Sequence, residues 1–235
     1  MNEKKYSNAK RAIRIVTFLT LIVAFFELLF AFTQYQPGMT IGDVATYVTN
    51  KHHMYLLLLI LANIGLFPAA QLLYKENGIS LKDEIYDKKT LGKDILYGIG
   101  GFVVSELIGD AYGWLLEFIP GIGTTELARQ GRELNTGVVI MDVIALVLVS
   151  GIFKEIFFRG LAKRFGSEVL GELPALLLFN VLFAVLDWHN LGVSFIIGLV
   201  WIFAYRKTNH LITPMICHAS SGLFYLIWSL IVHAS

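Results

Sequence analysis

Seven apolar runs occupy most of this 235-residue chain, at about 15–32, 54–74, 95–118, 138–158, 173–187, 191–205 and 211–232. A run of about 20 apolar residues is long enough to cross a bilayer as a helix, and a helix satisfies its own backbone hydrogen bonds in lipid. Hydrophobic residues make up 56% of the chain and charged residues only 16%, far from the balance of a soluble domain. The pattern predicts an all-α, polytopic helical membrane protein with about seven transmembrane segments.

The runs follow one another without an internal repeat or a low-complexity tract, so we expect residues 1–235 to form a single membrane domain. No small-residue cleavage site follows the first run, which predicts an uncleaved span and not a signal peptide. The net charge of +1 and the absence of a long Lys/Arg run argue against a nucleic-acid partner. A single cysteine, Cys217, excludes an internal disulfide and a cysteine-based zinc motif.

The basic residues predict the orientation. With the N-terminus inside, 15 of the 19 Lys and Arg residues fall on the inner side, Lys51, Arg129 and Arg132 fall on the outer side, and Lys154 lies within an apolar run. Lys and Arg accumulate on the cytoplasmic side of membrane proteins. We therefore expect a multi-pass protein of the cell membrane with a cytoplasmic N-terminus and an external C-terminus.

Two of the runs are too short to span a bilayer. Residues 173–187 and 191–205 are 15 residues each, and such a helix reaches only about 22 Å, whereas the hydrocarbon core is about 30 Å thick. A short helical hairpin over about 173–205 is therefore predicted. Its turn, from Asp187 to Asn190, should lie within the protein and face other residues or a wet cavity, because lipid does not tolerate an exposed polar turn.

Ionisable residues inside apolar runs mark the candidate site, because each is costly in a membrane unless it is paired, hydrated or functional. Glu106 and Asp110 lie four residues apart, on one helical face, and either share a proton or a metal ion or line an interior polar seam; we favour the seam. Glu155 and Arg159 have the same spacing, which predicts an ion pair near the inner interface, and Arg159 can also reach the headgroups.

Three motifs within about residues 138–230 resemble those of the CPBP family of intramembrane proteases, also called CAAX-protease-like or Abi proteins. The family motif EExxxRG corresponds to KEIFFRG, from Lys154 to Gly160. The motif FxxxH corresponds to the stretch from Phe183 to Asp187, and HxxxN to the stretch from His218 to Gly222.

The resemblance implies a site in which the first Glu and two His residues activate water, an Asn polarises the carbonyl, and a zinc ion is held by Glu and His in some descriptions. This chain has Lys154, Asp187 and Gly222 at three of those positions. In an α-helix Glu155 is turned by about 100° from position 154, so we expect it not to replace the lost base, and we do not expect the helix to be rewound there. His189 and Asn190, in the turn, are the available substitutes.

These departures favour a pseudoprotease that contacts membrane lipids and binds a membrane-protein or peptide partner, and that needs no cofactor. The resemblance implies an immunity or regulatory role for a protein of this kind. We also expect Lys154 and Asp187 to form an ion pair. In the family pattern these two positions hold a carboxylate and an imidazole, whereas here they hold an ammonium group and a carboxylate. The alternative is an active intramembrane CAAX-type endopeptidase that uses Glu155, His189 and His218, with zinc. A transporter is a third hypothesis, although no inverted repeat is visible.

Overall fold

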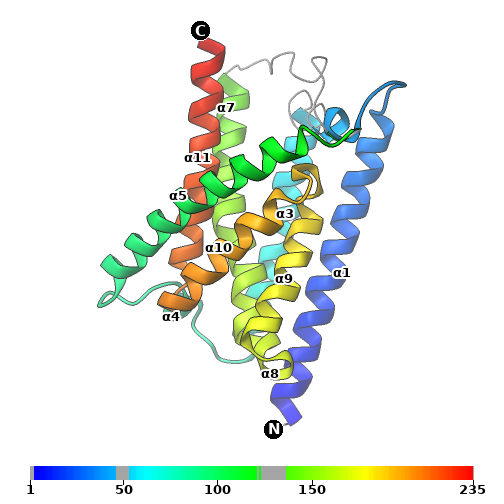
Figure 1. The fold of residues 1–235 in the computed structure, drawn as a ribbon. Helices are drawn as coiled ribbons and strands as arrows, with labels where there is room; N and C mark the ends of the chain where they lie inside the picture. Colours follow the sequence, from blue (N-terminus) through cyan, green and yellow to red (C-terminus); the bar gives the residue numbers. More distant parts are fainter. Residues whose placement is uncertain (1–2, 46–52, 121, 123–135, 235) are drawn as a thin grey trace.

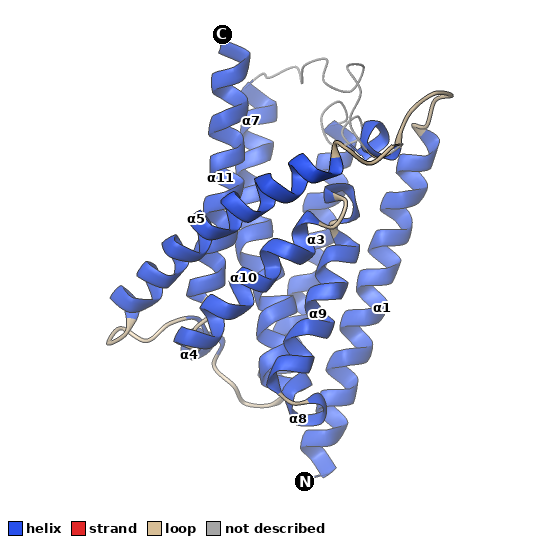
Figure 2. Ribbon diagram, viewed as in Figure 1, coloured by secondary structure: helices blue, strands red, loops and turns tan. Residues whose placement is uncertain are grey.

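The protein is helical throughout the residues that the computed structural model describes, which are 3–45, 53–120, 122 and 136–234, apart from short turns (Figure 1). These residues contain no strand (Figure 2). The long single helices are α1 (Glu3–Thr33), α3 (His53–Glu76), α5 (Leu91–Leu116) and α11 (Ile212–Ala234). One further long helix is built from α7 (Thr136–Asp142), the π-helical segments η1 (Val143–Lys154), η2 (Ile156–Gly160) and η3 (Ala162–Gly166), and α8 (Ser167–Leu170). The shorter elements are α4 (Leu81–Ile85), α9 (Glu172–Leu186), the 3-10 turn η4 (Trp188–Asn190) and α10 (Val193–Thr208).

The helices confirm a polytopic helical membrane protein. Each predicted apolar run falls on a helix, and four described helices are long and apolar enough to cross a membrane, namely Tyr6–Thr33, Leu91–Leu116, Thr136–Leu170 and Ile212–Ile231. Large apolar side chains point outward from them; Phe32 is 76% exposed and Leu96 70%. Apolar surface of this kind is suited to contact with lipid and not with water. The protein is therefore a membrane protein.

Two helices cross the others at a slant. In Figure 1 the axes of α1, α3, α9 and α11 are roughly parallel, whereas α5 and α10 lie obliquely across them. Helix α10 approaches α9 closely at Gly198, where an added Cβ would lie 2.0 Å from Oδ1 of Asn180. Helix α5 covers the turn after α9, where the hydroxyl of Tyr112 donates a hydrogen bond to the carbonyl of Leu191 at 3.4 Å.

Several helix ends lie at the end of the bundle that carries the N-terminus (Figure 1). Ion pairs there join Arg11 to Glu76, Arg164 to Glu84 at 3.8 Å, and Arg206 to Glu172 at 3.0 Å. The basic segments that the sequence places on the inner side are therefore close together in space. The C-terminus lies at the opposite end of the bundle (Figure 1).

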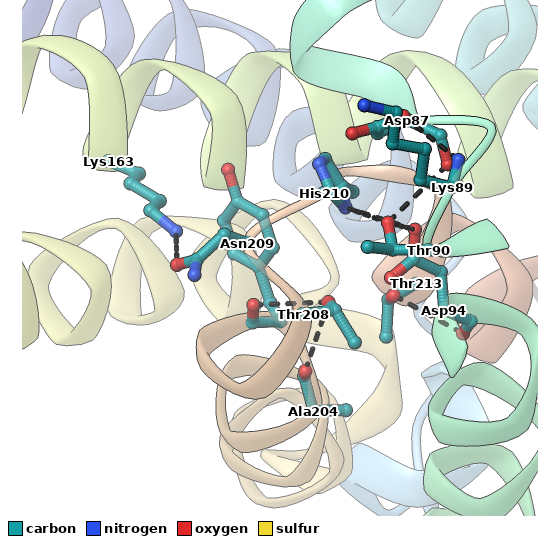
Figure 3. Close-up of polar contacts among 11 residues, drawn as sticks. Asp87, Lys89, Thr90, Asp94, Lys163, Ala204, Thr208, Asn209, His210 and Thr213 are labelled. Carbon is teal, nitrogen blue, oxygen red and sulfur yellow. Dashed lines mark hydrogen bonds and ion pairs between the residues drawn. The ribbon is translucent and has the colours of Figure 1, made fainter.

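The connection between α10 and α11 is fixed at the same end (Figure 3). Lys163 of η3 donates a hydrogen bond to Asn209. Nδ1 of His210 lies 3.0 Å from Oδ2 of Asp94 and 3.3 Å from the hydroxyl of Thr90. Because both contacts use the same ring nitrogen, this cluster cannot relay a proton from the hydroxyl through the ring to the carboxylate, and we interpret it as a structural tie between α5 and α11.

The predicted short hairpin is confirmed. Helix α9 has 15 residues and α10 has 16. The chain reverses between them at Leu191 and Gly192, whose φ values of 49° and 89° are both in the left-handed region. In Figure 1 this turn stops short of the upper ends of α1 and α11. The turn therefore lies within the bundle, as two short helices require.

A cluster of four buried aromatic rings lies between η2, α9 and α10, next to the candidate site. Phe158 packs edge-on against Phe157 and Phe183, with ring centroids 5.1 and 5.6 Å apart, and Phe183 lies 6.0 Å from Trp201. All four rings are almost completely buried. The cluster joins η2, α9 and α10 into one packed unit, which fixes the polar side chains that these helices carry.

Candidate functional site

A cavity of about 620 Å³ lies between α5, η1, the α9–α10 turn, α10 and α11. Its ionisable lining residues are Glu106, Asp110, Asp142, Lys154, Asp187, His189 and His218. Most of the residues that the sequence predicts for the site, including Asn190 and Gly222, thus border one space. The polar turn faces this cavity, as expected. Glu155 and Arg159 do not line it.

Lys154 and Asp187 form the predicted ion pair. Lys154 is the last residue of η1, and its ammonium group contacts Oδ1 of Asp187, directly after α9. Both side chains are buried, with 4% and 6% of their surface exposed. The hydroxyl of Ser194 donates a hydrogen bond to Oδ2 of Asp187 at 3.4 Å, and Asn190 donates one to Ser194 at 2.9 Å. The pair therefore ties η1 to the short hairpin at the wall of the cavity.

Glu155 links the same helix to α11. Its Oε1 lies 2.8 Å from Nδ1 of His218, and its Oε2 lies 3.4 Å from Nε of Arg159, one turn further along. The predicted i, i+4 ion pair of Glu155 and Arg159 is thus confirmed. All three side chains are buried. Glu155 is consequently held between a cation and an imidazole, and neither of its oxygens faces the cavity.

Arg159 is enclosed by protein and does not extend to the headgroups. Its Nη2 donates a hydrogen bond to Oδ1 of Asn180 at 2.9 Å, and Asn180 in turn donates to the carbonyl of Phe195 at 2.9 Å. The guanidinium carbon lies 4.1 Å from the ring centroid of Phe183 and 5.6 Å from that of Trp201. These contacts offset part of the cost of burying the charge, although Nε and Nη1 of Arg159 have no hydrogen-bond partner among the described residues.

The helix that carries Lys154 and Glu155 is not a regular α-helix, so our expectation of no rewinding there is wrong. It is wound as a π-helix over Val143–Lys154 and again after Glu155. A π-helix is rare, and single-turn π-bulges within α-helices are often found at functional sites. The two side chains still point to different partners, because Lys154 contacts Asp187 on one side and Glu155 contacts His218 on the other.

Gly222 is packed too tightly for a side chain. An added Cβ would lie 2.8 Å from the carbonyl oxygen of Leu146 in η1 and 3.1 Å from the Leu146 Cβ. The oxygen belongs to the backbone and cannot rotate away. At this position the family pattern has Asn, and the close approach of α11 and η1 leaves no room for one without a shift of the helices.

The remaining predicted residues lie on the opposite walls. Glu106 of α5 is half-buried and accepts a hydrogen bond from the hydroxyl of Ser221 at 2.5 Å. Asp110, one turn further along α5, is exposed at the edge. His189 lines the cavity next to Trp188, with ring centroids 6.2 Å apart.

The donor set does not fit a zinc ion in this arrangement. Among the described residues, no three His, Cys, Asp or Glu side chains are grouped so that they could hold a metal. Glu155 contacts Nδ1 of His218 and does not line the cavity, so of these two residues only His218, through Nε2, could offer a ligand atom there. The ammonium group of Lys154 lines the cavity and would repel a divalent cation.

Three residues of the site were not predicted from the sequence. Asn180 holds Arg159, Ser194 holds Asp187, and Trp201 lies with its ring centroid 4.6 Å from that of His218. A buried partner for Asn180 could have been predicted, because an amide group in an apolar helix must form a hydrogen bond. Ser194 and Trp201 could not have been predicted in this way, because small hydroxyl and aromatic residues are common in transmembrane helices.

Comparison with known families agrees with the resemblance in the sequence. Residues 136–224 match the family model for type II CAAX prenyl endopeptidase Rce1-like proteins. This segment begins at α7 and ends within α11, and so contains Lys154, Asp187 and His218. No curated protein and no solved structure matches the chain.

Proposed function

We propose, from the similarity of residues 136–224 to type II CAAX prenyl endopeptidases, that this CAAX-protease-like membrane protein binds a peptide or a segment of a membrane protein in its cavity without cleaving it. The observation that carries the proposal is the buried ion pair of Lys154 and Asp187 at the cavity wall. In the family pattern these positions hold a general base and a histidine.

The ion pair removes both groups that would activate water. A general base must be free to accept a proton within hydrogen-bonding reach of its substrate. An ammonium group cannot accept a proton, and the carboxylate of Asp187 is already engaged by Lys154 and Ser194. Separating the pair would expose two uncompensated charges in a buried site, which is strongly unfavourable.

The tight packing at Gly222 supports the proposal independently. Hydrolysis of a peptide bond develops negative charge on the carbonyl oxygen, and a hydrogen-bond donor at that point is worth about 2.7–4 kcal/mol in measured cases. Gly222 has no side chain, and the backbone of Leu146 blocks the space that one would occupy. The loss is built into the packing of α11 against η1, so exchanging one residue would not restore the donor.

The retained motif residues have a sufficient structural role. Glu155, Arg159 and His218 connect η2, α9 and α11 through buried contacts. Breaking such a network leaves a charge without a partner, which explains why the three remain although the catalytic groups have gone. We further propose that the site needs no zinc, and that the N-terminus is cytoplasmic.

One contact favours an active enzyme as a second hypothesis. The buried hydrogen bond of Glu155 and His218, at 2.8 Å, has the geometry of an acid–base pair. The position of Glu155 argues against this second hypothesis, because Glu155 does not line the cavity in which a substrate would lie.

Photocrosslinking separates the two hypotheses. The purified protein in lipid nanodiscs is incubated with a prenylated CAAX-type peptide that carries a benzophenone group and then irradiated. The proposal expects a crosslink to cavity residues and recovery of the peptide at its full mass. Recovery of shortened peptide, in amounts that fall when His218 is changed to Ala, would support the active enzyme instead.

A further inference from the structure

Helices α5 and α10 pack against each other in opposite directions. An added Cβ at Gly101 of α5 would lie 3.4 Å from the Cβ of Ala204 in α10. Nearer to the beginning of α5, Oδ2 of Asp94 lies 3.0 Å from Nδ1 of His210, which follows the end of α10 (Figure 3). The first turn of α5 and the last turn of α10 therefore lie side by side, toward the end of the bundle that carries the N-terminus (Figure 1).

Each of these two turns carries an exposed lysine. Lys93 lies in the first turn of α5, and Lys207 lies in the last turn of α10. Their ammonium groups lie over aromatic rings one helical turn away, 5.8 Å from the ring centroid of Tyr97 and 5.3 Å from that of Phe203. Among the described residues, neither ammonium group has a carboxylate partner. Two cations that rest on aromatic rings thus face outward from adjacent helices.

The acidic side chains closest to these turns are already engaged. Asp94 is fully buried and contacts His210. Glu172 pairs with Arg206 of the last turn of α10, at 3.0 Å. The loop before α5 adds two lysines and one aspartate at residues 87–89, all of them exposed. The two turns and this loop therefore present a net positive charge.

Large apolar side chains are exposed within one helical turn of each lysine. Leu96 of α5 is 70% exposed, and Phe203 of α10 is 60% exposed. Both helices thus change from charged to apolar at adjacent turns, as membrane helices do at the boundary between headgroups and hydrocarbon. A soluble anion or an acidic protein would contact the lysines and leave the apolar side chains uncovered, whereas a phospholipid contacts both.

We propose that the first turn of α5 and the last turn of α10 form a site for an anionic phospholipid. Its phosphate lies against the ammonium groups of Lys93 and Lys207, and its acyl chains cover Leu96 and Phe203. A phospholipid with a choline or ethanolamine headgroup fits less well, because its own cation offsets the charge of the phosphate. The inference concerns the outside of the bundle, so it goes beyond the proposed function and does not depend on the cavity.

The test titrates the purified wild-type protein in detergent micelles with phosphatidylglycerol or with phosphatidylcholine of the same acyl chains. Native mass spectrometry resolves the lipid-bound forms and gives the Kd of the first bound lipid. We expect phosphatidylglycerol to bind about 10-fold more tightly, which corresponds to about 1.4 kcal/mol. This comparison changes only the lipid, so it does not depend on how a variant folds. Equal Kd values would overturn the proposal.

Protein variants then locate the preference. Lys93→Gln combined with Lys207→Gln should abolish it, whereas Lys93→Arg combined with Lys207→Arg should retain it, because the charges remain. The matched control is Lys10→Gln combined with Lys75→Gln, which removes the same charge from exposed positions of α1 and α3. Lys10 also lies over an aromatic ring, 4.1 Å from the centroid of Tyr6. The control should keep the preference.

Three results with these proteins would overturn the proposal. A preference that survives the double Lys→Gln substitution on α5 and α10 would show that the lipid binds elsewhere. An equal loss in the control would show that the whole basic end attracts anionic lipid, without a site on α5 and α10. The soluble headgroup glycerophosphoglycerol, added in excess, should not displace the lipid from the wild-type protein; displacement would show that the acyl chains contribute nothing, and would overturn the choice of a phospholipid.

Discussion

Removing either partner of the Lys154–Asp187 pair should destabilise the protein far more than removing both. Lys154→Met keeps the length of the side chain without its charge, and Asp187→Asn keeps the shape and the acceptor for Ser194. Because both side chains are almost fully buried, each single change leaves one charge without a partner, at a cost of about 3–5 kcal/mol. The double variant leaves no charge and should recover most of that loss.

The measurement is a double-mutant cycle. Unfolding of the four proteins by sodium dodecyl sulfate in mixed micelles is followed by far-ultraviolet circular dichroism, and the interaction energy is the departure from additivity. The matched control is the pair of Arg206 and Glu172, 3.0 Å apart with 43% and 41% of their side chains exposed. Exposed pairs contribute about 0–1 kcal/mol, so Arg206→Met and Glu172→Gln should show little coupling.

Two results would refute the reasoning. If the single effects at Lys154 and Asp187 simply add, the side chains do not interact, and the buried pair is not what replaces the catalytic groups. If the coupling is no larger than that of the exposed control, the site is wet enough to screen both charges. Either result would remove the physical basis for the loss of activity.

Three further predictions concern packing, topology and metal content. Gly222→Ala should destabilise the protein by about 1–3 kcal/mol in the same unfolding assay, because the added methyl group overpacks the contact. Gly113→Ala should not destabilise it, because an added Cβ there meets nothing within 4 Å. Equal effects of the two substitutions would contradict the packing argument. In a Cys217→Ser background, an impermeant thiol reagent added to intact cells should label Gln36→Cys but not Lys88→Cys, and the reverse would overturn the orientation. Elemental analysis of the purified wild-type protein should find no stoichiometric zinc, and one zinc per chain would contradict our view of the donor set.

The sequence is sufficient to predict the class of fold and the neighbours that charge dictates. The apolar runs have the length and composition of membrane helices, so their number and order follow from the printed residues. The pair of Lys154 with Asp187 follows from their opposite charges at two motif positions that the resemblance brings together in one site. Glu155 and Arg159 follow from helical spacing alone.

What the sequence does not reveal depends on backbone geometry and on tertiary packing. The π-helical winding around Lys154 leaves no recognisable pattern, since the same residues suit an α-helix. The enclosure of Arg159 depends on Asn180, which lies 21 positions away and meets it only when α9 packs on η2. The obstruction at Gly222 arises from the backbone of Leu146, and a backbone contact between two distant helices has no signature in residue types.

The most direct test of the central claim is a single-turnover cleavage assay with the protein in excess over a prenylated CAAX-type peptide, with zinc added and mass spectrometry as the readout. The account predicts that the peptide stays intact, with the wild-type protein indistinguishable from the His218→Ala variant. Cleavage by the wild-type protein that is lost in both Glu155→Ala and His218→Ala would contradict the claim, because it would show that the chain hydrolyses peptides despite the ion pair of Lys154 and Asp187.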